Sequence, residues 1–311
     1  KARRRWGPEI FERLFVRTVQ QCVAAGLVDG SKLHMDATFV DADASKDSVK
    51  KGSPELIEAL RKAYNSQESK LDDVSDADCD SPDDQADDDH GMSTGASNDD
   101  NPSTKPLVNQ TLLSTTDPDT AVVRQGKREP RPRYKHHRAV DDAHGVVTAM
   151  TTTAGDVNEA ELLSPLIDQH EQNTKLDVDT VVADSCYGTI ENQLACADRG
   201  IHGHMADLHK KQKGSGRRAG IFDQSIFIFD ASSNTYTCPA GNRMHPRRLH
   251  GERQSWDYVT ERGVCASCEL RSDCTRSKTG RSIKRHIEQD RIDLARRRAA
   301  CILAKRDRLR R

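Results

Sequence analysis

Two aspartates in apolar, strand-like stretches are the residues best suited to metal-dependent chemistry. Asp36 lies within LHMDATFVDADAS (33–45), and Asp184 lies within VDTVVADSCYG (178–188). Burying an unpaired carboxylate is costly, and aspartates at strand ends of α/β sheets tend to face the crevice beyond the sheet. If the two strands are neighbours, the carboxylates converge, and oxygen ligands suit Mg²⁺ or Mn²⁺. The alternative is that both aspartates are unrelated helix or turn caps.

Four of the nine cysteines are spaced like zinc ligands. They are Cys238, Cys265, Cys268 and Cys274. A C-x₂-C pair with two further cysteines nearby can close a tetrahedral zinc site. His245 or His250 could replace one thiolate, and free buried thiols are the alternative. A disulfide framework is not expected, because no secretory signal segment opens the chain.

The net charge of −1 hides a strong separation of charge. Residues 71–100 contain 12 aspartates and no Lys or Arg, and removing the −12 of this window leaves +11 on the other residues. Residues 124–138 hold seven basic side chains, and residues 281–311 hold twelve against four acids. A basic body with one acidic run favours a polyanionic partner. Ordinary solvated charge on helix faces is the alternative.

Apolar periodicity predicts the elements that must position these residues. In chain order they are a helix over 9–25, a strand over 33–45, a helix over 54–64, a hairpin over 133–142 and 145–153, a helix beginning at Asn158, a strand over 178–188, a helix over 190–200 and a strand over 201–206. Asn158 and Glu161 are placed to form a capping box for the helix that follows. This order predicts one mixed sheet with helices on its faces.

Composition limits what else the chain can be. The hydrophobic fraction is 34% and the charged fraction 31%, which allows one modest core. No run approaches the roughly 18 apolar residues of a membrane span, so membrane-spanning and secreted proteins are both disfavoured. The chain starts at Lys1 without a methionine and stops at Arg311 within a basic run, and we expect it to be a fragment of a longer protein.

Four short motifs resemble a known family. They are LHMDAT (33–38), STTDPD (114–119), YKHH (134–137) and ADSCYG (183–188). In this order they are similar to bacterial insertion-sequence transposases of the DDE type, which have a ribonuclease-H-like catalytic domain. The resemblance runs from about Arg5 to the last residue. It implies a cytoplasmic, nucleoid-associated protein whose partner is DNA, with a possible homodimer and no membrane.

The resemblance also implies a mechanism. Asp36 and Asp184 would be the first two metal-binding carboxylates, holding two Mg²⁺ or Mn²⁺ ions for DNA strand cleavage and strand transfer. The third carboxylate of the family is a Glu that follows an Arg/Lys-rich segment. That segment is present here as residues 295–311, whereas Glu288 lies upstream of it. We therefore expect the third ligand beyond residue 311. The alternative is a catalytically inactive remnant that only binds DNA.

Basic and aromatic side chains near these motifs are candidates for DNA contacts. Tyr134, Lys135 and His137 lie on the strand predicted beside the first, and Lys135 and His137 share one of its faces. The final helix adds Arg296, Arg297 and Arg298. A polar sheet face with ordinary surface charge is the alternative.

The predicted fold is a ribonuclease-H-like mixed α/β sheet with a disordered acidic insertion and a small cysteine-rich zinc subdomain. The insertion cannot bury enough apolar surface to offset its ordering entropy. The expected divisions are an N-terminal helix (1–30), the first strand and helix (31–66), the insertion (67–105), the rest of the catalytic domain (106–235), the cysteine-rich subdomain (236–280) and a basic helical tail (281–311).

Overall fold

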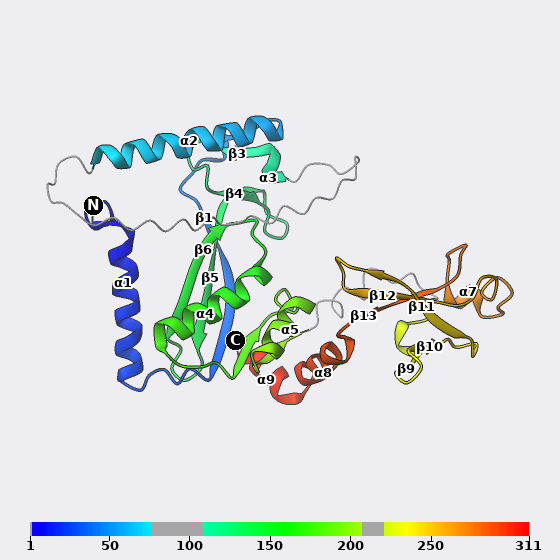
Figure 1. Ribbon diagram of the computed structural model, residues 1–311. Coiled ribbons are helices and arrows are strands. Elements are labelled where there is room, and N and C mark those ends of the chain that lie inside the picture. Colours follow the sequence, from blue (N-terminus) through cyan, green and yellow to red (C-terminus); the bar gives the residue numbers. More distant parts are fainter. Residues whose placement is uncertain (1, 76–107, 207–220, 311) are drawn as a thin grey trace. The chain divides into compact units, whose positions relative to one another are not determined.

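A computed structural model describes residues 2–75, 108–206 and 221–310 (Figure 1). The chain divides into two compact units. The first contains residues 1–36, 138–149 and 159–311, and the second contains residues 37–137 and 150–158.

A six-stranded sheet has the order β4-β5-β1-β7-β8, with β6 paired to β5. Strands β1, β7 and β8 run parallel to one another, whereas β4 is antiparallel to β5. The strands are β1 (Lys32–Asp41), β4 (Ala121–Val123), β5 (Arg131–Asp141), β6 (Val147–Ala154), β7 (Thr180–Ala183) and β8 (His202–Met205). The mixed sheet flanked by helices confirms the predicted ribonuclease-H-like fold class, and the predicted order of its main elements is also correct.

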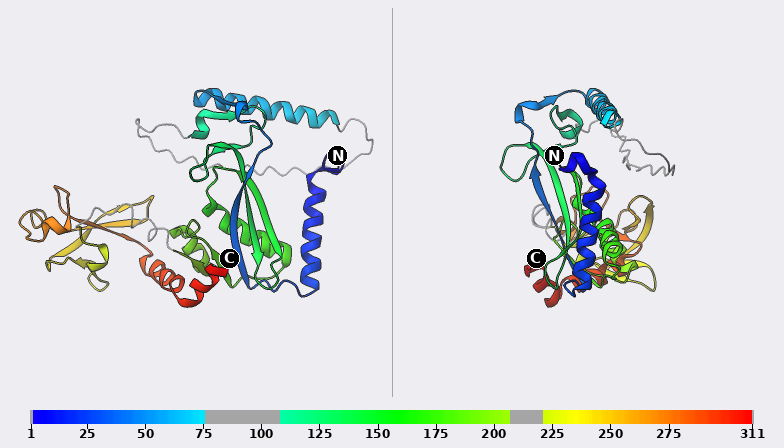
Figure 2. Two further views of the ribbon diagram at one scale, coloured as in Figure 1. Left: turned by 180° about the vertical axis from the view of Figure 1, so that it is seen from behind. Right: turned by 90° about the vertical axis from the view of Figure 1, so that its left-hand side faces the viewer.

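In the first unit, one face of the parallel strands packs against helices. Leu33 and Met35 of β1 are fully buried with Leu166 of α4 in a single apolar cluster, as the two-residue period of a strand requires. Helix α1 packs on α4 (Figure 2), whereas α8 and α9 contact the edge strand β8. The helices are α1 (Ala2–Ala24), α4 (Leu163–Thr174), α5 (Ile190–Asp198), α8 (Gln289–Ala299) and α9 (Ile302–Arg310).

The start of α4 differs from the prediction. A 3₁₀ turn over Glu159–Leu162 precedes the helix, and the residue that caps α4 is Leu162, with no side-chain hydrogen bond to the helix. The helix predicted to begin at Asn158 thus starts with a 3₁₀ turn, and the capping box of Asn158 and Glu161 stays a prediction. This turn brings Glu159 into the region of the candidate site.

The second unit contains the last residues of β1 (37–41), the first residues of β5 (131–137) and several short elements. Here β2 (Val49–Lys51) pairs with β3 (Leu112–Ser114), and the hydroxyls of Ser48 and Ser114 lie 2.9 Å apart. A 3₁₀ turn (Lys46–Ser48) and α3 (Val108–Thr111) adjoin this pair. Helix α2 (Pro54–Ser75) is longer than the predicted 54–64 and extends into the segment 67–105 that was expected to be disordered. Residues 76–105 of that segment lie outside the described residues.

The cysteine-rich part of the first unit is a five-stranded antiparallel sheet with the order β13-β12-β11-β10-β9. Its strands are β9 (Ile228–Asp230), β10 (Thr235–Thr237), β11 (Arg243–His250), β12 (Ser255–Val259) and β13 (Ser282–His286). A 3₁₀ turn (Gln224–Ile226) precedes β9, and α7 (Arg271–Cys274) lies between β12 and β13. The predicted bounds 236–280 are therefore too narrow. Strand β13 also replaces the start of the helical tail predicted over 281–311.

Candidate active site

Asp36 and Asp184 lie at corresponding positions of two neighbouring parallel strands. The register of β1 and β7 pairs Lys32 with Thr180 and His34 with Val182, a constant offset of 148 residues. If this offset is continued two residues beyond the pair of His34 and Val182, Asp36 comes opposite Asp184, the first residue after β7. Residues in register on parallel strands project to the same face, so both aspartates belong to the face opposite Leu33 and Met35. The prediction that these strands are neighbours is confirmed.

A third acidic side chain lies beside Asp184. Ligand-capable atoms of Glu159, Asp184 and Cys186 all lie within 4.8 Å of one another. The backbone N–H of Cys186 donates to Oδ1 of Asp184 at 2.7 Å, which fixes the carboxylate in the turn after β7. Carboxylate oxygens suit Mg²⁺ or Mn²⁺, whereas an exposed thiol does not. Sequence reasoning missed Glu159, because the capping box assigned that region to a helix end.

The side chains of Lys135 and His137 are buried. Lys135 is 7% exposed, donates from Nζ to the carbonyl of Val157 at 2.7 Å and lies 5.1 Å from the ring centroid of Phe39. His137 is fully buried, with Nε2 2.9 Å from the hydroxyl of Thr153. The two share a face, as predicted, but that face is internal. The expected phosphate contacts by Lys135 and His137 do not fit this arrangement.

The environment of His137 keeps its imidazole neutral. Burial, followed by the charges of Lys135 and His136, lowers the pKa of His137 to about 4. A neutral imidazole forms no ion pair with a phosphate at pH 7, and the enclosed side chain packs between β5 and β6 beside Thr153.

The side chain of Tyr134 links two of the motifs that carry the family resemblance. Its hydroxyl donates to Oδ1 of Asp117 at 2.7 Å. Burial and this hydrogen bond raise the pKa of Tyr134, so the phenol stays protonated and its donor is already used. The predicted DNA contact of Tyr134 stays a prediction.

The arginines at the end of α8 differ in exposure. Arg296 is half-buried and lies 3.6 Å from the carboxylate of Asp293, whereas Arg297 and Arg298 are exposed. Arg291, earlier in α8, pairs with Asp198 and Glu288. Only Arg297 and Arg298 of the predicted trio are thus exposed, and Nε of Arg297 donates to the carbonyl of Asp293 at 3.3 Å.

A buried carboxylate holds α9 on the face of the sheet that carries the two aspartates. Asp307 accepts from Nζ of Lys32 at 3.1 Å and lies 2.7 Å from Nδ1 of His204. Lys32 is two strand periods before Asp36, and His204 pairs with Val182, which is one strand period before Asp184. These side chains therefore project from one face. Burial is the largest effect on Asp307 and opposes ionisation, but the hydrogen bonds from Lys32 and His204 lower its pKa overall.

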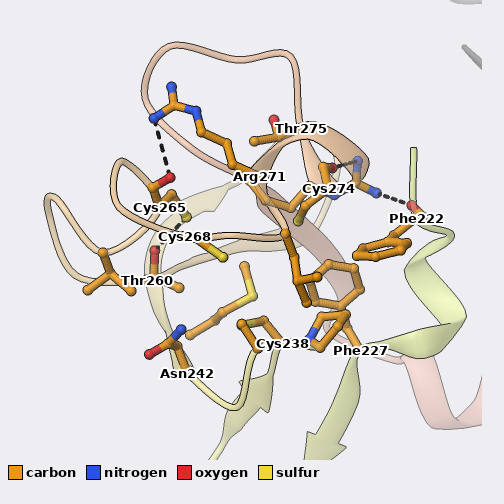
Figure 3. Close-up of a pocket in the computed structure, with 16 residues that line it drawn as sticks. Phe222, Phe227, Cys238, Asn242, Thr260, Cys265, Cys268, Arg271, Cys274 and Thr275 are labelled. Carbon is orange, nitrogen blue, oxygen red and sulfur yellow. Dashed lines mark hydrogen bonds between the residues drawn. The ribbon is translucent and has the colours of Figure 1, made fainter. Parts of the chain in front are cut away.

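The four predicted zinc ligands line one pocket. Cys238, Cys265, Cys268 and Cys274 surround it together with Phe222 and Phe227 (Figure 3). Burial raises the pKa of the Cys274 thiol, and the other three thiols raise it further while Arg281 lowers it. Within residues 2–75, 108–206 and 221–310, however, the Glu159 cluster is the only set of three such ligands within 4.8 Å. No three of these sulfurs therefore all lie within 4.8 Å of one another, whereas tetrahedral zinc requires about 3.8 Å between every pair.

The two histidines considered as replacement ligands do not line this pocket. His245 is exposed on β11, and Nε2 of His250 lies 2.8 Å from Oδ2 of Asp257. The hydroxyl of Thr260 lies 3.2 Å from Sγ of Cys265 instead. The four-cysteine set is therefore the better candidate for a metal centre in this sheet.

Comparison with known proteins identifies a family. A family model described as a transposase DDE domain matches residues 107–301. This range includes Asp184 and the four pocket cysteines, and Asp36 lies before it. No curated protein and no solved structure matches the chain. In the described part of the chain, no helix is both long and apolar enough to cross a bilayer.

Proposed function

Because this chain belongs to the transposase DDE domain family, we propose that it performs metal-dependent cleavage and strand transfer of DNA at a site built on Asp36 and Asp184. The observation that supports this proposal is the constant register of β1 and β7, which brings two aspartates far apart in sequence to the same face of adjacent strands. Glu159 adds a third carboxylate beside Asp184.

The donor set fits divalent cations that prefer oxygen. The carboxylates of Glu159 and Asp184, which lie within 4.8 Å of each other, repel one another unless a cation lies between them. Mg²⁺ or Mn²⁺ is bound by few carboxylates together with substrate phosphates. Two such ions, when bound, activate a water or 3′-hydroxyl and stabilise the leaving oxygen. Asp36 and Asp184 would hold the ions at the sheet, and the backbone N–H of Cys186 orients Asp184. Its DNA substrate would place the protein at the nucleoid. Because transposition acts on the two ends of one insertion sequence, we also propose that the protein works as a homodimer.

The decisive assay is strand cleavage and transfer by the full-length protein on labelled element-end DNA with Mn²⁺ or Mg²⁺. Asp36→Asn and Asp184→Asn should each lower the rate by at least about 100-fold, because each removes a charged metal ligand. Glu159→Gln should lower it less. Asp177→Asn changes an exposed aspartate outside the site and should leave the rate unchanged.

Two outcomes would contradict this assignment. If both Asp36→Asn and Asp184→Asn retained the wild-type rate, the site would lie elsewhere. If the wild-type protein bound DNA but showed no metal-dependent cleavage, the chain would act as a DNA-binding protein without catalysis.

We also propose that the four pocket cysteines hold one structural zinc ion. Four thiols converge on one pocket in a sheet with a small core, and a tetrahedral thiolate site stabilises folds of this size. Zinc binding would draw the sulfurs together from the wider spacing described above.

A further inference from the structure

The two faces of the cysteine-rich sheet have different chemistry. On the inner face, Tyr236 and Tyr258 pack with ring centroids 5.0 Å apart, and Phe229 lies 4.9 Å from Tyr236. Phe227 and Met244 belong both to this core and to the wall of the cysteine pocket. The inner face is therefore fully used by folding.

The outer face presents cations in neighbouring strands. The register places Arg248 of β11 opposite Asp257 of β12, and Asp257 opposite Lys284 of β13. Arg243 projects from the same strand as Arg248, and both are exposed, as is Lys284. The row from β11 to β13 thus has two exposed cations and one acid, and Asp257 already pairs with His250 at 2.8 Å.

A bulge in β11 adds a further cation to this surface. The pairing of β11 with β12 shifts between Pro246 and Arg248, which leaves Arg247 as the extra residue. In a regular strand one of two consecutive side chains would point into the core, but a bulge re-aims the local side chains. Arg247 and Arg248 are consecutive and both exposed.

The outer cations differ from the arginines that stabilise the module. Arg285 packs 3.7 Å from the ring centroid of Phe229 and pairs with Asp290. Arg281 donates to the carbonyls of Cys274 and Phe222. Among the residues that the structure describes, none of Arg243, Arg247, Arg248 and Lys284 forms an ion pair. Their charge is therefore available to a partner.

We propose that this basic face, formed by Arg243, Arg247, Arg248 and Lys284, binds the phosphodiester backbone of duplex DNA. The proposal rests on the DNA-directed function above. Alternate residues along a strand lie about 6.7 Å apart, and β11 and β13 lie about 9.6 Å apart. Charges spread in this way over a sheet surface suit an extended polyanion rather than a small anion that needs converging donors. Phosphate contacts carry no base information, so the affinity they supply is independent of sequence.

The test compares two variants that change net charge equally. Arg247→Gln with Arg248→Gln removes two cations from the basic face, and Arg13→Gln with Arg17→Gln removes two exposed cations from α1. Binding to a labelled random-sequence duplex is measured by fluorescence anisotropy between 50 and 200 mM KCl, without divalent metal. Loss of two phosphate contacts should lower the log–log salt slope by about 1.8. Wild-type protein should then lose about 12-fold more affinity across this range than the β11 variant.

Three results would overturn the proposal. The first is an unchanged salt slope in the β11 variant with its fold intact by circular dichroism. The second is an equal decrease of the salt slope in the α1 variant, which would show an effect of net charge alone. The third is a change in salt slope that the β11 substitutions cause only when residues 71–100 are present. That result would mean that the basic face binds the chain's own acidic run. Because no divalent metal is present, none of these results depends on cleavage activity, which the Asp36→Asn and Asp184→Asn variants test separately.

Discussion

Replacing Asp307 with alanine should release α9 from the sheet while leaving the core folded. The variant leaves Lys32 and His204 without the carboxylate that lies 3.1 and 2.7 Å from them. Removing one partner of a fully buried pair costs about 3–5 kcal/mol, whereas exposed pairs contribute about 0–1 kcal/mol. The side chains here are 11% exposed for Asp307, 28% for Lys32 and 14% for His204. We therefore expect an intermediate loss of about 2 kcal/mol.

Hydrogen exchange measured by mass spectrometry reports this loss locally. A change of about 2 kcal/mol corresponds to roughly 30-fold faster exchange of the α9 amides, with little change in α4. The lowered pKa of Asp307 means that its carboxylate stabilises the fold at pH values above the ordinary Asp pKa. This stabilisation is lost as the pH falls through the lower folded value. The difference between wild type and variant should therefore shrink below about pH 4.

The matched control is Asp198→Ala, which breaks the pair with Arg291. Those side chains are 63% and 41% exposed, so exchange should rise less than about fivefold. Equal effects of the two substitutions on α9, or an equal rise in α4 and α9 after Asp307→Ala, would refute the assignment of Asp307 as a local anchor. Because α9 lies over the face that carries Asp36 and Asp184, Asp307→Ala should also slow metal-dependent cleavage.

Two further predictions concern buried groups outside the carboxylate cluster. Since the pKa of His137 falls to about 4 in the folded protein, the free energy of unfolding should be highest above pH 6.5 and should fall by on the order of 3 kcal/mol as the pH drops from 6.5 to 4. Urea unfolding should show this pH dependence in wild type and a weaker one in His137→Gln. An equal pH dependence in the two proteins would contradict the prediction. Elemental analysis of the purified protein should find about one zinc ion per chain. The Cys268→Ser variant should lose this zinc, whereas Cys22→Ser, which changes a thiol in α1, should keep it. An equal zinc content in the two variants would rule out the cysteine pocket as the zinc site.

Strand periodicity predicted the sheet and its two aspartates well, because burial imposes a two-residue period that a sequence displays directly. Leu33 and Met35 alternate with His34 and Asp36, and the structure places these pairs on opposite faces. The same period placed Lys135 and His137 on one face. It could not show which face is internal, because β5 carries polar side chains on both.

Features that depend on distant contacts could not be predicted. The position of Glu159 beside Asp184 depends on a 3₁₀ turn before α4, whereas the local pattern of Asn158 and Glu161 favoured a cap. The sheet around the cysteines was missed because β11, RMHPRRLH, has no apolar alternation. It is stabilised by pairing on both edges rather than by its own pattern.

The offset of 148 residues between β1 and β7 has a consequence for biosynthesis. A growing chain exposes the β7-facing edge of β1 until residue 180 has left the ribosome, since no earlier segment pairs there in the finished sheet. At about 5–20 residues per second this interval lasts roughly 7–30 s. Throughout it Asp36 lacks its partner, and an unpaired strand edge is open to wrong pairing. The edge of β1 that carries Asp36 is therefore exposed to wrong pairing throughout this interval, which ends when β7 joins the sheet.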